Sequence, residues 1–390
     1  MLNRRQTLAG ISAAMATGLG STAQAQEVTK IGLILPMTGQ SASTGRQIEA
    51  AAKLYMAQKG ATVAGRRIEL LVRDDTGAAD VTRRIAQELI VNDKVAVLAG
   101  FGLTPLAFAV APLATQSKTP MVVMAAATSA ITEQSPFITR TSFTLPQATQ
   151  PIADWAAQNG IKKVISLVTD YAPGIDAEKA FKERFTKAGG ELMAEVRVPL
   201  RSPDFAPFLQ RVADSKPDAL FVFVPSGIGG QFVKQFIERG LDKAGVKLIG
   251  TGDVTDDDLL NDMGDAILGV VTSHHYSAAH PSAENKAFVQ AFRAANPNMR
   301  PNFMAVGGYD GMHLIYEALK KTNGTGDGTA LIGAMQGMSW VSPRGPITIE
   351  ARTRDITQNI YVRRVEKVDG QLYNVEFATF EAVPDPIKGR

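Results

Sequence analysis

The chain has 390 residues, with 41 lysines and arginines against 38 aspartates and glutamates, which gives a formal net charge of +3. A chain of this length predicts two domains, and the near balance of charge argues against a nucleic-acid-binding protein, which usually carries a basic stripe. Cysteine is absent, so disulfides, thiolate metal sites and cysteine nucleophiles are excluded.

The first 25 residues are typical of a cleavable export signal. Arg4 and Arg5 form its charged start, and residues 8–19 form an apolar stretch that is too short to span a bilayer. Ala23 and Ala25 fit the small-residue cleavage rule. We therefore expect cleavage after Ala25, by either the general or the twin-arginine export route, and a periplasmic mature protein. Loss of the two arginines leaves the mature chain nearly neutral.

After this signal, strand-like and helix-like patterns alternate in two successive units. Strands are predicted at 28–35, 67–73, 95–99 and 120–124, with helices at 45–59, 80–92 and 105–117. The second unit has strands at 163–168, 191–198, 219–224, 246–249 and 268–272, with helices at 146–159, 175–188, 205–213 and 231–239. Strands separated by helical patterns of this length predict βαβ units and parallel sheets covered on both faces.

The C-terminal part changes character. Helical patterns at 283–295 and 303–321 precede strands at 346–349, 359–368 and 371–380, the last two joined by Asp369 and Gly370, a strong hairpin signal. The predicted fold is therefore α/β, with two doubly wound units and an antiparallel tail.

Small and hydroxylated residues follow two neighbouring strands of the first unit. Residues 100–105 contain Thr104, and residues 125–129 end in Thr128 and Ser129, each just before a predicted helix start. Ligands of open α/β sheets bind at the carboxyl ends of strands, and helix N-termini offer free N–H donors. Either hydroxyl alone could simply cap its helix, but together they predict a cradle for an anion, most simply a carboxylate.

Other kinds of site find little support. The first strand is followed by residues 36–41 (PMTGQS), which lack the glycines of a dinucleotide fingerprint. His274 and His275 are adjacent at a strand end and point to opposite faces, so they cannot jointly bind one metal. We therefore expect no metal and no cofactor. An exported hydrolase remains a rival, with Thr104 and His275 as its candidate nucleophile and base.

A run of acidic residues follows the strand that ends at residue 249. Residues 256–258 (DDD) suggest a calcium loop but lack its glycine and glutamate, so we expect them to cap a helix. Asp253 is different, because it stands close to the strand end and so at the mouth of a cleft.

Several short segments together resemble a known family. They are residues 36–39 (PMTG), 71–75 (LVRDD) and 120–128 (PMVVMAAAT), together with Tyr171 and Tyr309. In their order and spacing the chain resembles the periplasmic solute-binding proteins of ABC transporters, in the branch of the leucine/isoleucine/valine-binding proteins.

This resemblance implies two lobes joined by three crossover segments, with the ligand in the cleft between them and closure by hinge motion. Lobe I would comprise residues 26–145 and 274–350, and lobe II residues 146–273 and 351–390. The expected function is delivery of a small carboxylate to an ABC permease in the inner membrane, by a monomer that is not an enzyme.

The family's carboxylate cradle corresponds to Thr104 and to the pair Ala127 and Thr128 of this sequence, and its closing tyrosine corresponds to Tyr171. The resemblance also places Tyr309 in the predicted site.

The part of the family pattern that holds an ammonium group is altered. The acidic position of amino-acid binders falls on Gly252, one residue before Asp253, and Thr44 replaces a bulky aromatic residue. Phe101, Tyr171 and His275 (or His274) could contact a ring. We therefore expect an aromatic or apolar organic acid rather than a branched-chain amino acid, which Asp253 would still permit.

Overall fold

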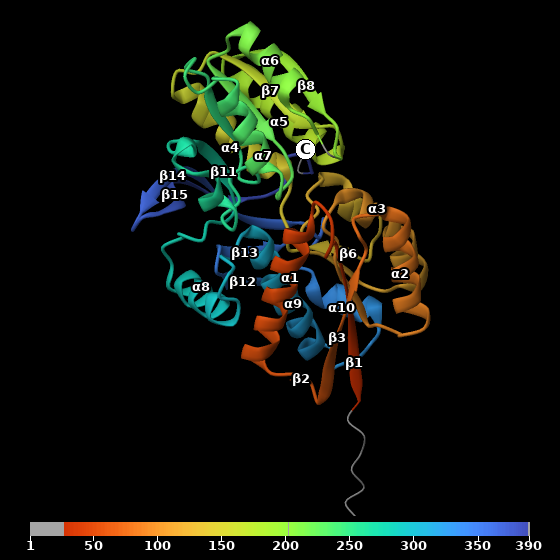
Figure 1. Ribbon diagram of the computed structural model, residues 1–390. Helices are drawn as coiled ribbons and strands as arrows, with labels where there is room; N and C mark the ends of the chain where they lie inside the picture. The colour runs from red at the N-terminus through yellow and green to blue at the C-terminus, as the bar shows by residue number, and fades with distance from the viewer. Residues whose placement is uncertain (1–26, 202, 389–390) are drawn as a thin grey trace, which may run out of the picture.

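The computed structural model describes residues 27–201 and 203–388, so the predicted export signal lies outside the described residues. Two separate sheets organise the chain into two lobes (Figure 1). The first sheet has six strands in the order β2-β3-β1-β4-β5-β6, all parallel except for β2. Its strands are β1 (Val28–Leu35), β2 (Thr62–Val63), β3 (Arg66–Asp74), β4 (Val97–Gly100), β5 (Met121–Val123) and β6 (Ile138–Arg140). The connecting helices are α1 (Ala42–Lys59), α2 (Ala79–Val91) and α3 (Thr104–Ser117).

The second sheet has nine strands in the order β12-β13-β14-β11-β10-β9-β7-β8, with β15 paired to β14. Its parallel part is β7 (Lys163–Thr169), β8 (Glu191–Val198), β9 (Ala219–Phe223), β10 (Lys247–Thr251) and β11 (Val271–His274). Its antiparallel part is β12 (Ser339–Ser342), β13 (Gly345–Ile349), β14 (Ile356–Val368) and β15 (Gln371–Val383). The helices of this lobe are α4 (Leu145–Gln158), α5 (Ala172–Lys187), α6 (Ala206–Ser215) and α7 (Gly229–Glu238).

Three late helices return to the first lobe. They are α8 (Ala283–Ala295), α9 (Phe303–Lys321) and α10 (Gly328–Met335), and in Figure 1 they lie near α1 and the first sheet. Gly307 allows the close approach of α9, because a Cβ atom there would lie 2.2 Å from the carbonyl oxygen of Met124. The apolar core of this lobe thus depends on segments far apart in the sequence. We call the β1–β6 unit with α8–α10 the first lobe and the β7–β11 unit the second lobe.

The predicted fold class is confirmed, with two parallel-sheet lobes. Helix α10, strand β6 and the short strand β12 were missed, since each is short and carries little periodic signal. Strands β12 and β13 fall within the 274–350 range assigned to lobe I, yet they pair into the second sheet. The reason is the length of β14, whose start pairs with β13 and whose later residues pair with β11. The exact lobe boundaries stay a prediction.

In the ranges that the structure describes, no helix has both the length and the hydropathy that a membrane span requires.

Candidate ligand-binding site between the lobes

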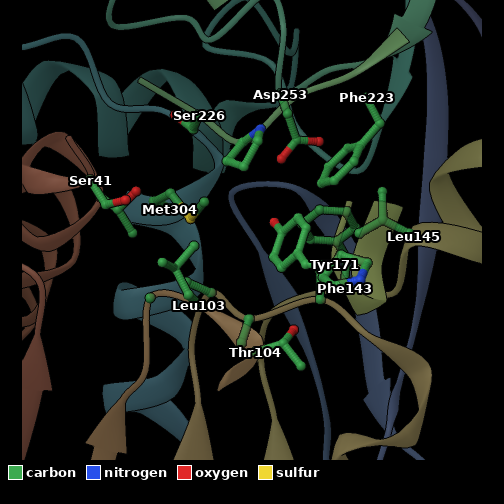
Figure 2. Close-up of a pocket in the computed structure, with 17 residues that line it drawn as sticks. Ser41, Leu103, Thr104, Phe143, Leu145, Tyr171, Phe223, Ser226, Asp253 and Met304 are labelled. Atoms are coloured by element: carbon green, nitrogen blue, oxygen red, sulfur yellow. The ribbon is translucent and has the colours of Figure 1, made fainter. Parts of the chain in front are cut away.

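A cavity lies between the two lobes at the carboxyl ends of their parallel strands (Figure 2). The first lobe contributes residues that follow β1, β4, β5 and β6, and the second contributes residues at the ends of β7, β9 and β10. The space in it that protein atoms do not fill is about 380 Å³, open solvent at its mouth included. Among the predicted site residues, Thr44, Thr104, Ala127, Tyr171 and Asp253 line this cavity.

Thr104 lies where the first turn of helix α3 meets the cavity. It is the first residue of the helix, follows the extended residue Leu103 and is only 1% exposed. Its hydroxyl oxygen has no hydrogen-bond partner within the described residues. In this first turn Pro105 carries no N–H and Leu106 donates to the carbonyl of Leu103, which leaves the backbone N–H of Thr104 as the free donor. This corner of the cavity therefore combines an unpaired hydroxyl with the positive end of a helix dipole, an arrangement that favours an anion.

Aromatic rings form one wall of the cavity. Tyr171 and Phe223 of the second lobe stack with ring centroids 6.0 Å apart and an interplanar angle of 19°, and Phe143 of the first lobe lies beside them. Burial, together with the charge of Asp253, raises the pKa of Tyr171 well above its usual value, so the phenol is neutral at pH 7. Flat apolar surfaces of this kind suit a ring or a compact hydrocarbon group.

Asp253 is the acidic residue of the lining, and it is 4% exposed. Its Oδ2 accepts a hydrogen bond of 2.9 Å from the Thr251 hydroxyl and lies 3.5 Å from Nε2 of His274. His274 is fully buried, and that burial lowers its pKa to about 4 despite the neighbouring carboxylate, so the imidazole is neutral at pH 7. No lysine, arginine or histidine belongs to the described lining, so an anionic ligand here would depend on neutral donors.

Thr128, a predicted member of the cradle, is already bonded to a carboxylate of the protein. Its hydroxyl donates to Oδ2 of Asp176 over 2.6 Å, and the N–H of Ser129 donates to the same oxygen over 3.0 Å. Asp176 belongs to α5 of the second lobe, and burial raises its pKa. Thr128 and Ser129 therefore bind a carboxylate, but this carboxylate is the side chain of Asp176 and connects the two lobes. Thr128 does not line the cavity.

The other three predicted site residues also lie outside the lining. Phe101 is fully buried in the apolar core around α2 and α3, because its positive φ of 65° turns it away from the cleft. His275 is buried against Phe143, with ring centroids 4.9 Å apart. Tyr309 lies on α9 and donates a hydrogen bond to Gln58 of α1. The structure thus places these three residues outside the cavity lining.

The structure also corrects two other expectations. Both the Thr104 hydroxyl and the two ring nitrogens of His275 lack hydrogen-bond partners in the described chain, so they do not form the nucleophile–base pair that a hydrolase would need.

Residues 256–258 do not cap a helix, because the next element is a 3₁₀ helix at Leu260–Met263 whose N-cap is Leu259. Among the described residues, no three histidine or acidic side chains are grouped so that they could hold a metal ion.

Asp256 instead joins the lobes. Both of its oxygens accept hydrogen bonds of 2.9 Å from Nδ2 of Asn302, which caps helix α9 of the first lobe, and Ser226 donates to Oδ2. Burial raises the pKa of Asp256 to about 7, and the charge of Asp258 adds to the shift, while the hydrogen bonds from Ser226 and Asn302 oppose it. Burial and the hydrogen bond from the first lobe thus act on the pKa of this carboxyl group in opposite directions, and burial outweighs the bond.

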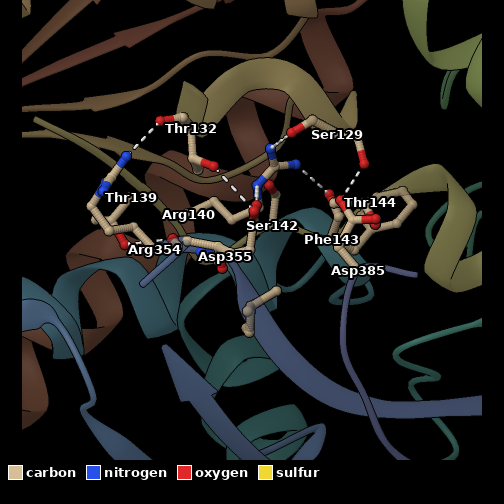
Figure 3. Close-up of polar contacts among 12 residues, drawn as sticks. Ser129, Thr132, Thr139, Arg140, Ser142, Phe143, Thr144, Arg354, Asp355 and Asp385 are labelled. Carbon is tan, nitrogen blue, oxygen red and sulfur yellow. Dashed lines mark hydrogen bonds and ion pairs between the residues drawn. The ribbon is translucent and has the colours of Figure 1, made fainter. Parts of the chain in front are cut away.

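A buried ion pair sets the position of the first-lobe loops (Figure 3). Nε of Arg140, at the end of β6, lies 2.6 Å from Oδ1 of Asp355, and both side chains are about as deeply buried as any in the chain. The same guanidinium donates to the carbonyl oxygens of Thr128 and Phe143. Because carbonyls of two loops converge on one cation, the wall around Phe143 is held in a defined place.

Sequence reasoning missed several lining residues, among them Ser41, Phe143, Phe223, Ser226 and Met304. Phe223 and Ser226 follow the strand-end rule and could have been found from it. Phe143 follows the missed strand β6, and Met304 comes from α9, so neither had a local signal.

Two α/β lobes with a cavity between the carboxyl ends of their strands are typical of proteins that bind small molecules between two lobes. The chain matches the family model described as periplasmic binding protein over residues 28–371, and it belongs to that family. This finding confirms the resemblance inferred from the sequence.

Relatives and solved structures agree with this assignment. The chain is 45% identical over 374 residues to the Leu/Ile/Val-binding protein homolog 6 of Brucella melitensis, covering 94% of this chain and 95% of the relative. A solute-binding protein of an ABC transporter from Rhodopseudomonas palustris BisB5, solved with 3,4-dihydroxybenzoic acid, has a TM-score of 0.91 and 66% identity, covering 93% of this chain and 99% of that one. Its counterpart from Rhodopseudomonas palustris HaA2, solved with p-hydroxybenzoic acid, has a TM-score of 0.90 and 44% identity, covering 93% and 100%.

Proposed function

We propose that this protein is the extracytoplasmic solute-binding component of an ABC uptake transporter and that its ligand is an aromatic carboxylate. The single observation that carries the ligand class is the buried, unpartnered hydroxyl of Thr104 at the N-terminus of α3, beside an aromatic wall. A buried carboxylate costs several kcal/mol unless its oxygens are hydrogen-bonded, and this corner supplies neutral donors for it.

The arrangement of the cavity supports an aromatic body for the ligand. The rings of Tyr171, Phe223 and Phe143 lie beside the anion corner, and Met304 lies across from them in Figure 2. The two Rhodopseudomonas relatives were solved with hydroxylated benzoic acids, which have this combination of a carboxylate and a flat ring. For a ligand of about ten heavy atoms, micromolar affinity corresponds to about −8 kcal/mol, well inside the ceiling of about −1.5 kcal/mol per atom.

In this proposal the lobes separate to admit the ligand, close on it, and are recognised in the closed form by a membrane permease. The protein acts in the periplasm as a monomer, after removal of residues 1–25, and carries out no catalysis. The contacts of Thr128 with Asp176 and of Asn302 with Asp256 support the closing motion, because each joins residues of different lobes.

A branched-chain amino acid is the second candidate. It is favoured by one observation, the carboxylate of Asp253 in the lining, which could pair with an ammonium group. The name of the Brucella relative points the same way.

A ligand panel measured by thermal shift and calorimetry separates the two candidates. Benzoate, 4-hydroxybenzoate and 3,4-dihydroxybenzoate are compared with leucine, valine and the uncharged 4-hydroxybenzamide. We expect the aromatic acids to stabilise the protein and the amide to have little effect, because the amide lacks the charge that the α3 corner would bind. Stabilisation by leucine or valine without any by the aromatic acids would refute the proposed ligand class.

A further inference from the structure

We propose that Asp253 is a specificity-determining residue that selects aromatic acids carrying a hydroxyl group on the ring, at the end opposite to the carboxylate. The inference rests on the proposed function and adds a second recognition point to it. It assigns the ring hydroxyl as hydrogen-bond donor and Oδ1 of Asp253 as acceptor.

The two oxygens of Asp253 have different environments. Oδ2 accepts the hydrogen bond from Thr251 and faces His274, whereas Oδ1 accepts no hydrogen bond from any described residue. Figure 2 shows the Asp253 carboxylate at the cavity wall. The side chain is 4% exposed, so bulk water has little access to it. A carboxylate oxygen in such a place needs a donor, and the Tyr171 hydroxyl, which is close enough to feel the Asp253 charge, makes no hydrogen bond to it in the described structure, so a ligand hydroxyl can take that place.

The neighbouring His274 does not supply that donor, and the charge of Asp253 is compensated only from outside the lining, by the buried guanidinium of Arg363 next to Gly252. His274 is held between the rings of Phe143 and Phe303, with centroids 4.6 and 4.3 Å away, and its nitrogens make no hydrogen bond in the described structure. Burial keeps this imidazole neutral at pH 7, since its pKa is lowered to about 4. The Asp253 carboxylate therefore faces the cavity without a cation in the lining.

The positions of Thr104 and Asp253 also determine the direction of the ligand. They lie on opposite sides of the cavity in the view of Figure 2, with the Tyr171 ring between them. Repulsion between two negative charges keeps the ligand carboxylate away from Asp253 and directs it to the α3 corner. The far edge of the ring then meets Oδ1 of Asp253. A hydroxyl there donates a hydrogen bond to a charged acceptor, whereas a C–H leaves the acceptor unpaired.

The test is a comparison of dissociation constants for benzoate, 4-hydroxybenzoate and 4-fluorobenzoate. The fluorine occupies the position of the hydroxyl but cannot donate. We expect the wild-type protein to prefer 4-hydroxybenzoate over both others by roughly tenfold to a hundredfold, the value of one hydrogen bond to a charged group. Equal binding of the hydroxyl and fluoro compounds would overturn the proposal without any mutation.

The variants D253L and D253N test whether the preference for the hydroxyl compound depends on Asp253. In D253L the preference should fall to about one or below, while benzoate binds as well as before or more tightly, because a like charge has been removed. D253N keeps the shape and should retain only a few-fold preference, since a neutral acceptor makes a weaker bond. A structural role for Asp253 would instead weaken all three ligands by the same factor, and that result, or an unchanged preference, would refute the inference.

The matched control is E376Q, which alters a second histidine–carboxylate pair, at 2.7 Å between His280 and Glu376, away from the cavity lining. It should leave the ligand preference unchanged. If no benzoate derivative binds to the wild-type protein, the proposed function fails. If they bind without distinction between hydroxyl and fluoro groups, only the role of Asp253 fails.

Discussion

Replacement of Thr104 by valine gives opposite effects on ligand affinity and on the stability of the ligand-free protein. The substitution keeps the branched shape of the side chain and removes its hydroxyl group. Because Thr104 is 1% exposed and its hydroxyl has no partner in the described structure, loss of the hydroxyl breaks no hydrogen bond of the folded protein. We therefore expect the free energy of unfolding of T104V to be unchanged or up to about 1 kcal/mol higher, since an unpaired buried polar group is costly.

The ligand complex should respond in the other direction. A hydrogen bond to a charged group contributes about 1.5–3 kcal/mol, so loss of the Thr104 donor should weaken binding of an aromatic carboxylate by about 10- to 150-fold. Pro105 carries no N–H, and the N–H groups of Leu106 and Ala107 donate to the carbonyl of Leu103, so the backbone N–H of Thr104 is the donor of this turn that remains. Binding should therefore be weakened and not abolished. Titration calorimetry with 3,4-dihydroxybenzoate measures the affinity, and thermal or urea denaturation without ligand measures the stability.

The control is T29V, which makes the same chemical change elsewhere. The Thr29 hydroxyl, on β1, is also buried without a partner in the described chain, but it does not line the cavity. T29V should affect stability as T104V does and leave affinity at the wild-type value. Equal affinity of T104V and T29V, with both proteins folded, would refute the assignment of the carboxylate to the α3 corner.

Three further predictions concern the contacts around the cavity. Burial raises the pKa of Asp256 to about 7, so closure of the lobes takes up a proton, and affinity should rise by up to roughly tenfold per pH unit as the pH falls below about 7. Calorimetry between pH 8 and 5.5 should show a smaller rise in D256N, and an affinity that falls on acidification would contradict the coupling. D176A removes the carboxylate that Thr128 binds across the lobes, and it should weaken all ligands by about the same factor, roughly tenfold at pH 8. A change in ligand preference would show instead that Asp176 reaches the site. D355A leaves the buried Arg140 without its ion-pair partner and should cost about 3–5 kcal/mol in urea denaturation. A cost below about 1 kcal/mol would show that carbonyl oxygens alone satisfy Arg140.

Much of the fold was predictable from local patterns. Apolar runs such as residues 28–35 and 219–224 are buried in parallel sheets, and alternation with helices of regular length specifies the βαβ order. The Asp369–Gly370 hairpin also formed as expected, with both residues at positive φ. These features depend on neighbours a few residues apart, which the sequence displays directly.

The candidate site was only partly predictable. The strand-end rule led to Thr104 and Asp253, and the family resemblance to Thr44, Ala127 and Tyr171, and all five line the cavity. The same rule could not separate Thr104 from Phe101 or Ala127 from Thr128, because the backbone of each loop decides which side chain faces the cleft.

By itself, the sequence determined the α/β class, the two lobes, the absence of thiol chemistry and the strand ends at which a ligand would bind. Only the tertiary structure decided which residues share the cavity. It placed Met304 of α9 beside loops of both lobes, and it placed the Asp176 carboxylate where the Thr128 hydroxyl donates to it. The physical reason is that a local pattern records which residues are apolar or polar, whereas contacts between distant segments depend on how the lobes pack together. The unpaired hydroxyl of Thr104 and the free oxygen of Asp253 became visible only once the hydrogen bonds between distant segments were known.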